Sequence, residues 1–537
     1  MSRSCFLLGL DGGTFRIIDF CIQKGVMPFL KGFLKSSAFG PIESTIPTLT
    51  PPAWTTLATG RSPGHHGIFD FYTFESGSTR MLRLVSSRDI SCETVWSMAN
   101  RAGLRTAVLN YVATYPPPQI NGYIVPGWVP WRWMKFGSRP RGLFKDIGLQ
   151  KDINTKILAY HPDEEAKAIE GCGQEELEPW IALHIEREEQ WFRLARYLYE
   201  KDPSELTAVV LDGMDKIQHL CWRFIDPELS PGIPDKKFSA IRKLSFEYYR
   251  HVDRYIESLV KLSGPETTFI IASDHGFAPS EYQFSINVWL EEEGFLSWKD
   301  EGKTKAGRSE SLQINDPASV TLRSLDWDLT RAYAASPGTN GIFIPVSGSR
   351  NDKGIPPQNY DSTRDELITK LKKAKNPWNH MPLISHVWKK EELFSGPFLK
   401  NAPDVTFELF DNGHASISRN KSSVIPRQHT IGGHERPGIF AIRGPGILKG
   451  KHLDNISLLN VTPAILYSLN LPIPEDLEGG VVREAYSQQW IRQNPPQKGP
   501  PTVRRLRSGT AVKETDKLNK EEKEQIKKRL KTLGYFE

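Results

Sequence analysis

Thr48-Leu49-Thr50-Pro51-Pro52-Ala53-Trp54-Thr55-Thr56-Leu57-Ala58-Thr59-Gly60 follows an X-Pro turn at Ile46-Pro47. Two prolines directly after Thr50 fix φ and remove two backbone donors, so this stretch predicts a loop-to-helix junction at Thr50. A hydroxyl at such a junction faces the positive end of the helix dipole and free N–H groups, which suits an incoming phosphate. An ordinary N-cap threonine fits the same residues. The rest of the chain has to decide between the two interpretations.

The composition is that of a globular protein, with 537 residues of which 39% are hydrophobic and 25% charged. This length allows one large α/β domain with insertions or two domains. The net charge of +6 permits an anionic substrate without requiring nucleic acid. Five scattered cysteines without a CxxC spacing indicate free thiols and a reducing compartment, so we expect a cytoplasmic protein. No apolar run approaches the ~18 residues of a transmembrane segment, and the first run is too short for a signal peptide.

Short apolar runs predict buried parallel strands at 5–10, 206–211 and 268–272. Acidic and histidine side chains follow these runs or precede a further one at 439–443: Asp11, Asp215, His219, Asp274, His275 and His434. Because ligand-binding residues of open α/β sheets lie at the carboxyl ends of strands, we expect the six side chains to meet. Taken singly, these residues have ordinary structural explanations. An aspartate can stabilise a turn, an Asp and His four residues apart can lie on an exposed helix, and a histidine can be buried in the core.

The residue types in this set are those of a metal site. Asp215 and His219 have the i, i+4 spacing that places both on one helix face. Three aspartates, three histidines and the Thr50 hydroxyl suit two divalent metals about 4 Å apart, the usual clamp for in-line phosphoryl chemistry. The set contains no thiolate and favours zinc, with manganese or iron as alternatives.

The remaining segments predict additions to one α/β domain. The expected organisation is a catalytic domain over 1–485 with a cap insertion at about 115–200 and a subdomain at about 332–430, a linker at 486–517, and a charged C-terminal helix at 518–537. The lysines of that helix predict a solvated face rather than a nucleic-acid site. In the cap, Trp131 and Trp133 flank Arg132, a pattern that fits either a lid over an anionic substrate or a loop packed by its tryptophans.

The motifs and their order resemble the alkaline phosphatase superfamily, and most closely its type I phosphodiesterase/nucleotide pyrophosphatase branch. The matching residues are Gly9-Leu10-Asp11-Gly12, Pro47-Thr48-Leu49-Thr50-Pro51-Pro52, Thr59-Gly60 with His66-Gly67-Ile68, Asp215-x-x-x-His219, Ser273-Asp274-His275-Gly276 and Gly433-His434. The resemblance runs from residue 11 to residue 434 in its motifs, and to about 485 at the level of the fold. It implies an alkaline-phosphatase-like α/β fold, with a largely parallel central sheet flanked by helices and with cap and insertion segments.

The resemblance also implies roles for individual residues. Thr50 would be the nucleophile and would pass through a phosphothreonine intermediate. One metal would be bound by Asp11, Thr50, Asp274 and His275. The other would be bound by Asp215, His219 and His434. The second metal would stabilise the leaving oxygen while the first activates the Thr50 hydroxyl.

Two positions depart from the pattern of the nucleotide-cleaving members. Leu49 stands where they have a lysine before the nucleophile, and Phe71 stands where they have a phosphoryl-binding asparagine. These departures weigh against a nucleotide pyrophosphatase and leave phosphoester hydrolysis in place. Asn110 or Arg132 could supply the missing donor. A sulfatase is not indicated, because the stretch from Thr50 to Trp54 lacks the C/S-x-P-x-R motif of those enzymes.

The sequence therefore predicts a phosphohydrolase with two metals and a small phosphorylated substrate, cleaving diesters in preference to monoesters. A phosphomonoesterase, a phosphotransferase or a phosphomutase would use the same residues, because the shape of the pocket selects the acceptor. An alternative of another class is a non-catalytic scaffold that binds a phosphorylated ligand. The sequence does not give the physiological substrate or the oligomeric state.

Overall fold

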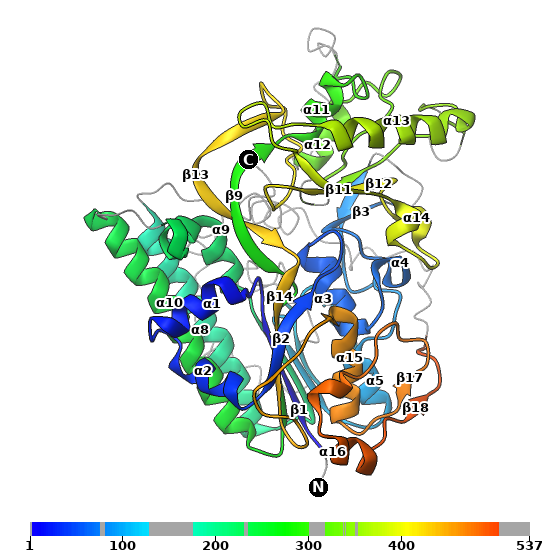
Figure 1. Cartoon of the computed structure of the whole chain (residues 1–537). Coiled ribbons are helices and arrows are strands. Elements are labelled where there is room, and N and C mark those ends of the chain that lie inside the picture. Colours follow the sequence, from blue (N-terminus) through cyan, green and yellow to red (C-terminus); the bar gives the residue numbers. More distant parts are fainter. Residues whose placement is uncertain are drawn as a thin grey trace, which may run out of the picture.

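The computed structural model of the chain describes residues 3–75, 81–127, 176–229, 235–299, 317–336, 338, 340–348 and 353–503. Figure 1 shows a lower α/β body, in which helices cover both faces of a central sheet, and a smaller group of helices and strands above it. A long ribbon formed by β9 (Gly276–Phe284) and β13 (Val424–Glu435) connects the two parts. The described residues include no helix with the length and apolar character needed to cross a membrane.

The central sheet has the strand order β15-β2-β14-β8-β1-β7-β5-β6, with β16 pairing on β2. The strands are β1 (Cys5–Leu10), β2 (Ala38–Glu43), β5 (Thr106–Leu109), β6 (Gly122–Val125), β7 (Leu206–Leu211), β8 (Thr268–Ala272), β14 (Pro437–Arg443), β15 (Lys451–His452) and β16 (Ile456–Ser457). Only β14 pairs antiparallel, with β2 and β8. The predicted strands at 5–10, 206–211 and 268–272 lie side by side and parallel, so their carboxyl ends share one edge of the sheet.

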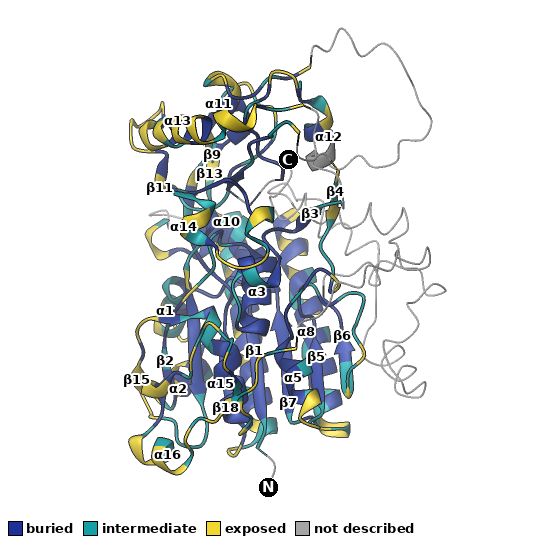
Figure 2. Cartoon of the chain, turned by 90° about the vertical axis from the view of Figure 1, so that its right-hand side faces the viewer, coloured by how far each residue is buried: buried dark blue, intermediate teal, exposed yellow. Residues whose placement is uncertain are grey.

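Alternating side chains of β1 build two cores. Phe6, Leu8 and Leu10 pack on one face of the sheet, and Cys5 and Leu7 pack on the other, as the period of two in a strand requires. The first face is covered by α1 (Phe15–Gln23), α2 (Pro28–Lys35), α8 (Leu177–Lys201), α9 (Gly213–Ile225) and α10 (Lys236–Ser263). The second is covered by α3 (Thr50–Thr59), α5 (Val95–Arg101) and α15 (Val461–Ser468). Figure 2 shows the strands of this sheet buried between the two layers.

Helix α3 begins at Thr50, as the sequence predicts. Leu49 is extended, with φ −128° and ψ 137°, and the two prolines occupy the next helical positions. Gly60 ends the helix in the left-handed conformation at φ 63°, which L side chains rarely adopt. The whole helix is buried, and Trp54 lies against β1 so closely that a Cβ on Gly9 would stand 2.4 Å from its ring. Gly9 therefore sets how closely the helix that carries Thr50 approaches the strand that carries Asp11.

The upper group of elements, called the upper subdomain below, has its own hydrophobic core. It contains a three-stranded sheet with the order β10-β12-β11 and four helices. Its elements are α11 (Ile286–Glu292), α12 (Pro317–Ser324), β10 (Gly341–Ile342), α13 (Tyr360–Lys373), β11 (Ile384–Lys389), α14 (Lys390–Leu393) and β12 (Val405–Leu409). Helix α13 and strand β12 lie within the expected subdomain at about 332–430. The division of the chain into domains stays a prediction.

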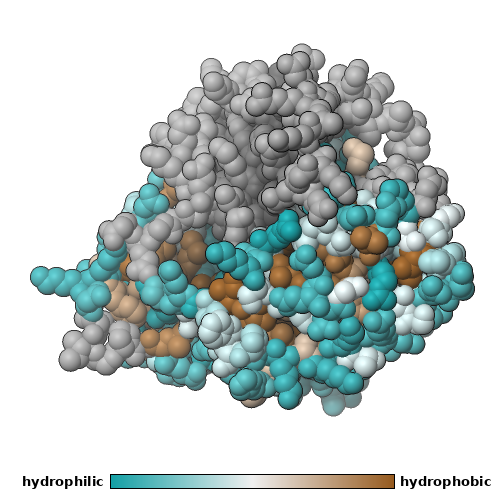
Figure 3. All heavy atoms as spheres, turned by 90° about the horizontal axis from the view of Figure 1, so that it is seen from above, coloured by the Kyte–Doolittle hydropathy of each residue, from teal (hydrophilic) through white to brown (hydrophobic). Residues whose placement is uncertain are grey.

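Short elements complete the description. They are α4 (Pro63–His66), the hairpin β3 (Tyr72–Phe74) and β4 (Leu82–Leu84), the pair β17 (Ile473–Pro474) and β18 (Lys498–Gly499), α16 (Gln488–Gln493), and 3-10 turns at Pro227–Leu229, Pro357–Asn359, Leu399–Asn401, Leu458–Asn460 and Arg483–Ala485. Seen from above, the described part of the visible surface is largely hydrophilic with scattered hydrophobic side chains (Figure 3).

The later part of the chain packs on the body. Helix α15 is buried on all sides because it packs in the core beside α3 and α5. The described part of the expected linker, up to Val503, packs on the body through β18, and Thr502 donates to Asp476. Most of the expected cap, including Arg132, and the expected helix at 518–537 lie outside the described residues.

Gly9→Ala should destabilise the protein by about 1–3 kcal/mol, because the added methyl group overpacks the Trp54 ring. The matched control is Gly32→Ala in the exposed part of α2, where a Cβ meets nothing within 4 Å and alanine favours the helix. Urea unfolding followed by tryptophan fluorescence measures both variants. Equal unfolding midpoints for Gly9→Ala and the wild type would contradict the close approach.

Candidate active site

The seven residues singled out in the sequence converge at the carboxyl edge of the central sheet. Asp11 follows β1, the Asp274-His275 pair follows β8, and Thr50 begins α3. Asp215 and His219 lie on α9, and His434 lies near the end of β13. All are buried except His219, whose side chain is 15% exposed. Two groups have ligand atoms within 4.8 Å of one another: Asp11, Asp274 and His275 in one, and Asp215, His275 and His434 in the other.

Backbone carbonyls orient the three histidine rings. Nδ1 of His275 lies 3.2 Å from the Gly276 carbonyl oxygen, Nδ1 of His219 lies 3.1 Å from that of Gly432, and Nδ1 of His434 lies 2.9 Å from that of Thr48. A carbonyl oxygen only accepts, so Nδ1 donates in each ring. In a neutral ring this leaves Nε2 unprotonated, which is the arrangement of a metal-ligating histidine.

The Nε2 atoms of His219 and His434 lie 3.0 Å apart. With Nδ1 protonated in both neutral rings, neither Nε2 carries a hydrogen, so the contact joins two lone pairs. Oδ1 of Asp215 lies 3.2 Å from Nε2 of His434 and 3.4 Å from Nε2 of His219. Two nitrogen lone pairs and one carboxylate oxygen directed at one point are a donor set that a divalent cation satisfies.

The other group has the same character. Nε2 of His275 lies 3.2 Å from Oδ2 of Asp274, 3.7 Å from Oδ1 of Asp11 and 3.4 Å from the Thr50 hydroxyl oxygen. Those two carboxylate oxygens are buried and accept no hydrogen bond among the described residues. Buried polar atoms ordinarily have partners, so these oxygens fit a bound cation.

The carboxyl groups respond to burial and to one another. Burial, with repulsion from Asp274 and Asp215, raises the pKa of Asp11 well above its usual value. Burial also raises the pKa of Asp274 to about 8, against the hydrogen bond that it accepts from the Gly12 N–H. A cation between two such groups favours their ionised forms. Burial likewise lowers the pKa of both His275 and His434, which keeps these rings neutral.

Lys216 also belongs to the site, which the sequence motifs did not predict. Its Nζ lies 2.8 Å from Oδ2 of Asp215, and the side chain is buried. Burial alone would raise the pKa of Asp215, but the Lys216 ammonium holds it well below its usual value. The charge of Lys216 also opposes the rise in the pKa of Asp11. The signal in the sequence was its place directly after Asp215, at the start of a helix that follows a buried strand.

A further layer of contacts fixes the ligands. Trp54 Nε1 donates to Oδ2 of Asp11 at 3.2 Å, and Gln218 Nε2 donates to the Gly12 carbonyl at 2.6 Å. His414 Nε2 lies 3.1 Å from the Thr48 carbonyl that also accepts from His434, and its ring meets that of His434 edge to face. No motif surrounds His414 in the sequence, so only the fold reveals it.

Strand β13 approaches α9 closely enough for His219 to reach Gly432. A Cβ on Gly432 would stand 2.4 Å from the Gln218 carbonyl oxygen, so only glycine permits this distance. The glycines before His434 thus determine how the last histidine and the α9 residues come together.

The structure places the other candidate residues as follows. Both N–H bonds of the Asn110 amide are directed at acceptors, the Val210 carbonyl at 2.8 Å and Oδ1 of Asp212 at 3.2 Å, so this group offers no further donor to a phosphoryl oxygen. Phe71 is buried in the core. His66 is also buried, and its Nδ1 accepts from the Ile68 N–H while its Nε2 meets Thr56 Oγ1 at 3.0 Å. Its position holds the loop after α3.

The fold and the site define an alkaline-phosphatase-like metallohydrolase. The likeness extends to solved structures. One is phosphonoacetate hydrolase from Sinorhizobium meliloti in complex with phosphonoformate, with 15% identity, 87% of this chain and 95% of that chain covered, and a TM-score of 0.55. Another is an inactive variant of murine ectonucleotide pyrophosphatase/phosphodiesterase 5 in complex with AMP. It has 15% identity, 90% of this chain and 100% of that chain covered, and a TM-score of 0.50. At this identity the likeness establishes the fold.

The family model described as type I phosphodiesterase / nucleotide pyrophosphatase matches residues 5–437. The chain belongs to this family, which confirms the resemblance seen in the sequence motifs. It is a metal-dependent phosphoester hydrolase of the alkaline phosphatase superfamily. A comparison with curated proteins gave no match.

Trp54→Phe should weaken metal binding about 10- to 100-fold, because it keeps a buried ring but removes the N–H that holds Asp11. Competition with a chromogenic zinc chelator measures the affinity. The matched control is Trp222→Phe, which removes an indole N–H that donates to no described residue. Equal affinities for the two variants would show that the Trp54 hydrogen bond does not orient Asp11.

Proposed function

We propose that the protein hydrolyses phosphodiesters of small molecules through a phosphothreonine at Thr50, with two divalent metal ions and with zinc as the first choice. One observation carries this proposal: the Thr50 hydroxyl lies at the first position of a buried helix and within 3.4 Å of an Nε2 atom that is itself aimed at two unsatisfied carboxylate oxygens. A hydroxyl placed only to cap a helix needs no such neighbours.

We assign seven of the described residues to two ligand sets. Asp11, Asp274, His275 and the Thr50 hydroxyl would hold one cation, and Asp215, His219 and His434 would hold the other. These seven side chains converge through the contacts described above, and none is a thiolate, which suits zinc and also admits manganese or iron. Metal ions bound there would supply Lewis-acid charge that acidifies the Thr50 hydroxyl and neutralises the leaving oxygen.

The chain itself positions the nucleophile. Leu49 is extended and Thr50 begins α3, so the hydroxyl projects from the positive end of the helix dipole. Proline at 51 and 52 leaves no backbone donors there, and the Ala53 N–H bonds the Leu49 carbonyl. The Thr50 N–H donates to no other described residue. This N–H is therefore the backbone donor available to a phosphoryl oxygen beside the nucleophile.

The proposed reaction consists of two in-line displacements. In the first, Thr50 Oγ loses its proton to solvent and forms a bond to phosphorus while the bond from phosphorus to the leaving oxygen breaks, and the leaving alkoxide takes a proton from water. In the second, water attacks the phosphothreonine, the bond from phosphorus to Thr50 Oγ breaks, and a phosphate monoester leaves. Thr50 takes up a proton and is restored.

The preference for diesters rests on the family and on the donors around Thr50. Leu49 is buried and apolar, Phe71 lies in the core, and the Asn110 amide is already engaged. A diester has two non-bridging oxygens and one negative charge, and needs fewer donors than a monoester with three such oxygens and a second charge.

The thiols support a proposal about location. Cys5, Cys21, Cys92 and Cys221 are buried and free. Free thiols are typical of reducing compartments, and we propose that the protein works in the cytoplasm. Labelling of intact and permeabilised cells with a membrane-impermeant reagent tests this assignment.

Thr50→Ala should lower turnover of bis-p-nitrophenyl phosphate at least about 1,000-fold, because removing a nucleophile takes away the covalent route. Thr50→Ser keeps a hydroxyl and should retain measurable turnover. The parallel assay with p-nitrophenyl phosphate should be slower for the wild type. Full activity of Thr50→Ala with metals bound would contradict the proposal, and a monoester preference would reassign the protein as a phosphatase or mutase.

His219→Ala should reduce the bound zinc from two ions to one per chain, because it removes one nitrogen of a three-ligand set and leaves the other set intact. Elemental analysis after dialysis measures the metal content. The control is His386→Ala on β11, where the side chain is 58% exposed and far from either ligand set in sequence. A wild type that holds a single ion would contradict the two-metal assignment.

A further inference from the structure

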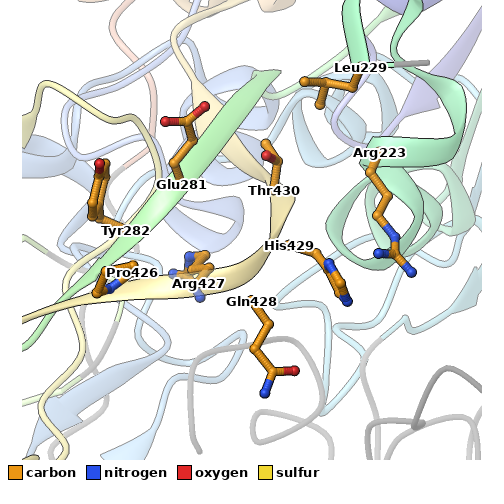
Figure 4. Close-up of a pocket in the computed structure, with 9 residues that line it drawn as sticks. All are labelled: Arg223, Leu229, Glu281, Tyr282, Pro426, Arg427, Gln428, His429 and Thr430. Atoms are coloured by element: carbon orange, nitrogen blue, oxygen red, sulfur yellow. The ribbon is translucent and has the colours of Figure 1, made fainter. Parts of the chain in front are cut away.

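A pocket opens between α9 and the ribbon of β9 and β13 (Figure 4). On α9, Arg223 lies four residues after His219 and eight after Asp215, so the three side chains follow one face of the helix. On β13, Thr430 lies two residues before Gly432, whose carbonyl accepts from His219. The pocket therefore lies next to the proposed leaving-group ligands, with Arg223 about 6 Å beyond His219 along the helix axis.

The pocket has the size of a binding site. Its volume is about 420 Å³, and ligand pockets commonly measure about 300–1,000 Å³. The lining includes Arg223 from α9, Glu281 and Tyr282 from β9, and Arg427, Gln428 and His429 from β13. Figure 4 shows the Arg223 and His429 side chains extending on the same side of β13, while Glu281 extends from β9 on the opposite side.

Irregular pairing brings the β13 residues into the pocket. The register between β13 and β9 shifts between Pro426 and Ile431, so the four residues from Arg427 to Thr430 are not paired in the ladder. A bulge of this kind redirects side chains and is common beside active sites. From this segment the His429 side chain extends toward Arg223 (Figure 4).

The charge of the pocket favours an anion. Arg223 makes no ion pair with a described residue, and its guanidinium carbon lies 4.5 Å from the centre of the Phe224 ring. Burial lowers its pKa, and burial together with Arg223 lowers the pKa of His429. The lining contains two arginines, Arg223 and Arg427, and one carboxylate, that of Glu281. A planar guanidinium held on an aromatic ring presents its N–H fork to a tetrahedral oxyanion.

We propose that this pocket binds a second phosphate-like dianion carried by the leaving group of the substrate. The inference rests on the proposed function, because it assigns the α9 side of the site to the leaving oxygen. It names a substrate class: phosphodiesters whose leaving alcohol carries a terminal phosphate or phosphonate. Arg223 binds the dianion, and His429 beside it supplies a further donor.

Two matched diesters test the pocket. Methyl 4-(phosphonomethyl)phenyl phosphate carries a non-hydrolysable dianion on its phenol, and methyl 4-methylphenyl phosphate lacks it. Release of each phenol by the metal-loaded protein is followed by liquid chromatography. The wild type should show a kcat/KM at least about tenfold higher for the phosphonomethyl ester, as expected for charge-assisted hydrogen bonds to a dianion.

Variants locate the source of the preference. Arg223→Gln should bring the kcat/KM ratio of the two esters toward one, and His429→Gln should lower it less. Arg193→Gln, in an exposed ion pair on α8, should keep the wild-type ratio. A wild-type ratio near one, or an unchanged ratio in both pocket variants, would overturn the inference while leaving the proposed function in place. A wild type that hydrolyses neither ester would overturn both.

Discussion

The site depends on the orientation of three imidazole rings by backbone carbonyls. The carbonyls of Thr48, Gly276 and Gly432 each accept from an Nδ1–H, and each ring then directs Nε2 toward the carboxylates. In water these rings would rotate freely. In the fold they are held by groups that belong to the loop before α3, to β9 and to β13, so the metal-binding geometry is a property of the backbone.

This constraint explains the construction around it. Strands β1, β7 and β8 are adjacent and parallel, which brings the three acidic segments to one edge of the sheet. Gly9 lets Trp54 lie on β1, and Gly432 lets β13 lie on α9. Trp54 in turn donates to Asp11, so the helix that carries Thr50 also fixes a carboxylate of the site. The same residues therefore determine both the packing of the fold and the geometry of the ligands.

The sequence predicted the fold class, the parallel strands and the convergence of seven residues, because each lies beside a strand end or a proline-marked helix start. It did not predict Lys216, Trp54 or His414 as parts of the site, since their roles depend on distances between distant segments. Asn110 illustrates the same limit: its place at the end of β5 was predictable, but the acceptors that engage its amide come from β7 and from Asp212. The complete burial of α15 likewise follows from tertiary packing.

The central claim, a covalent phosphothreonine, is tested most directly by the stereochemical course at phosphorus. A chiral phosphorothioate diester is hydrolysed in isotopically labelled water, and the configuration of the product is determined. Each in-line displacement inverts phosphorus, so attack by Thr50 followed by attack of water predicts net retention. Net inversion would mean that water attacks the diester directly, and would contradict the role assigned to Thr50.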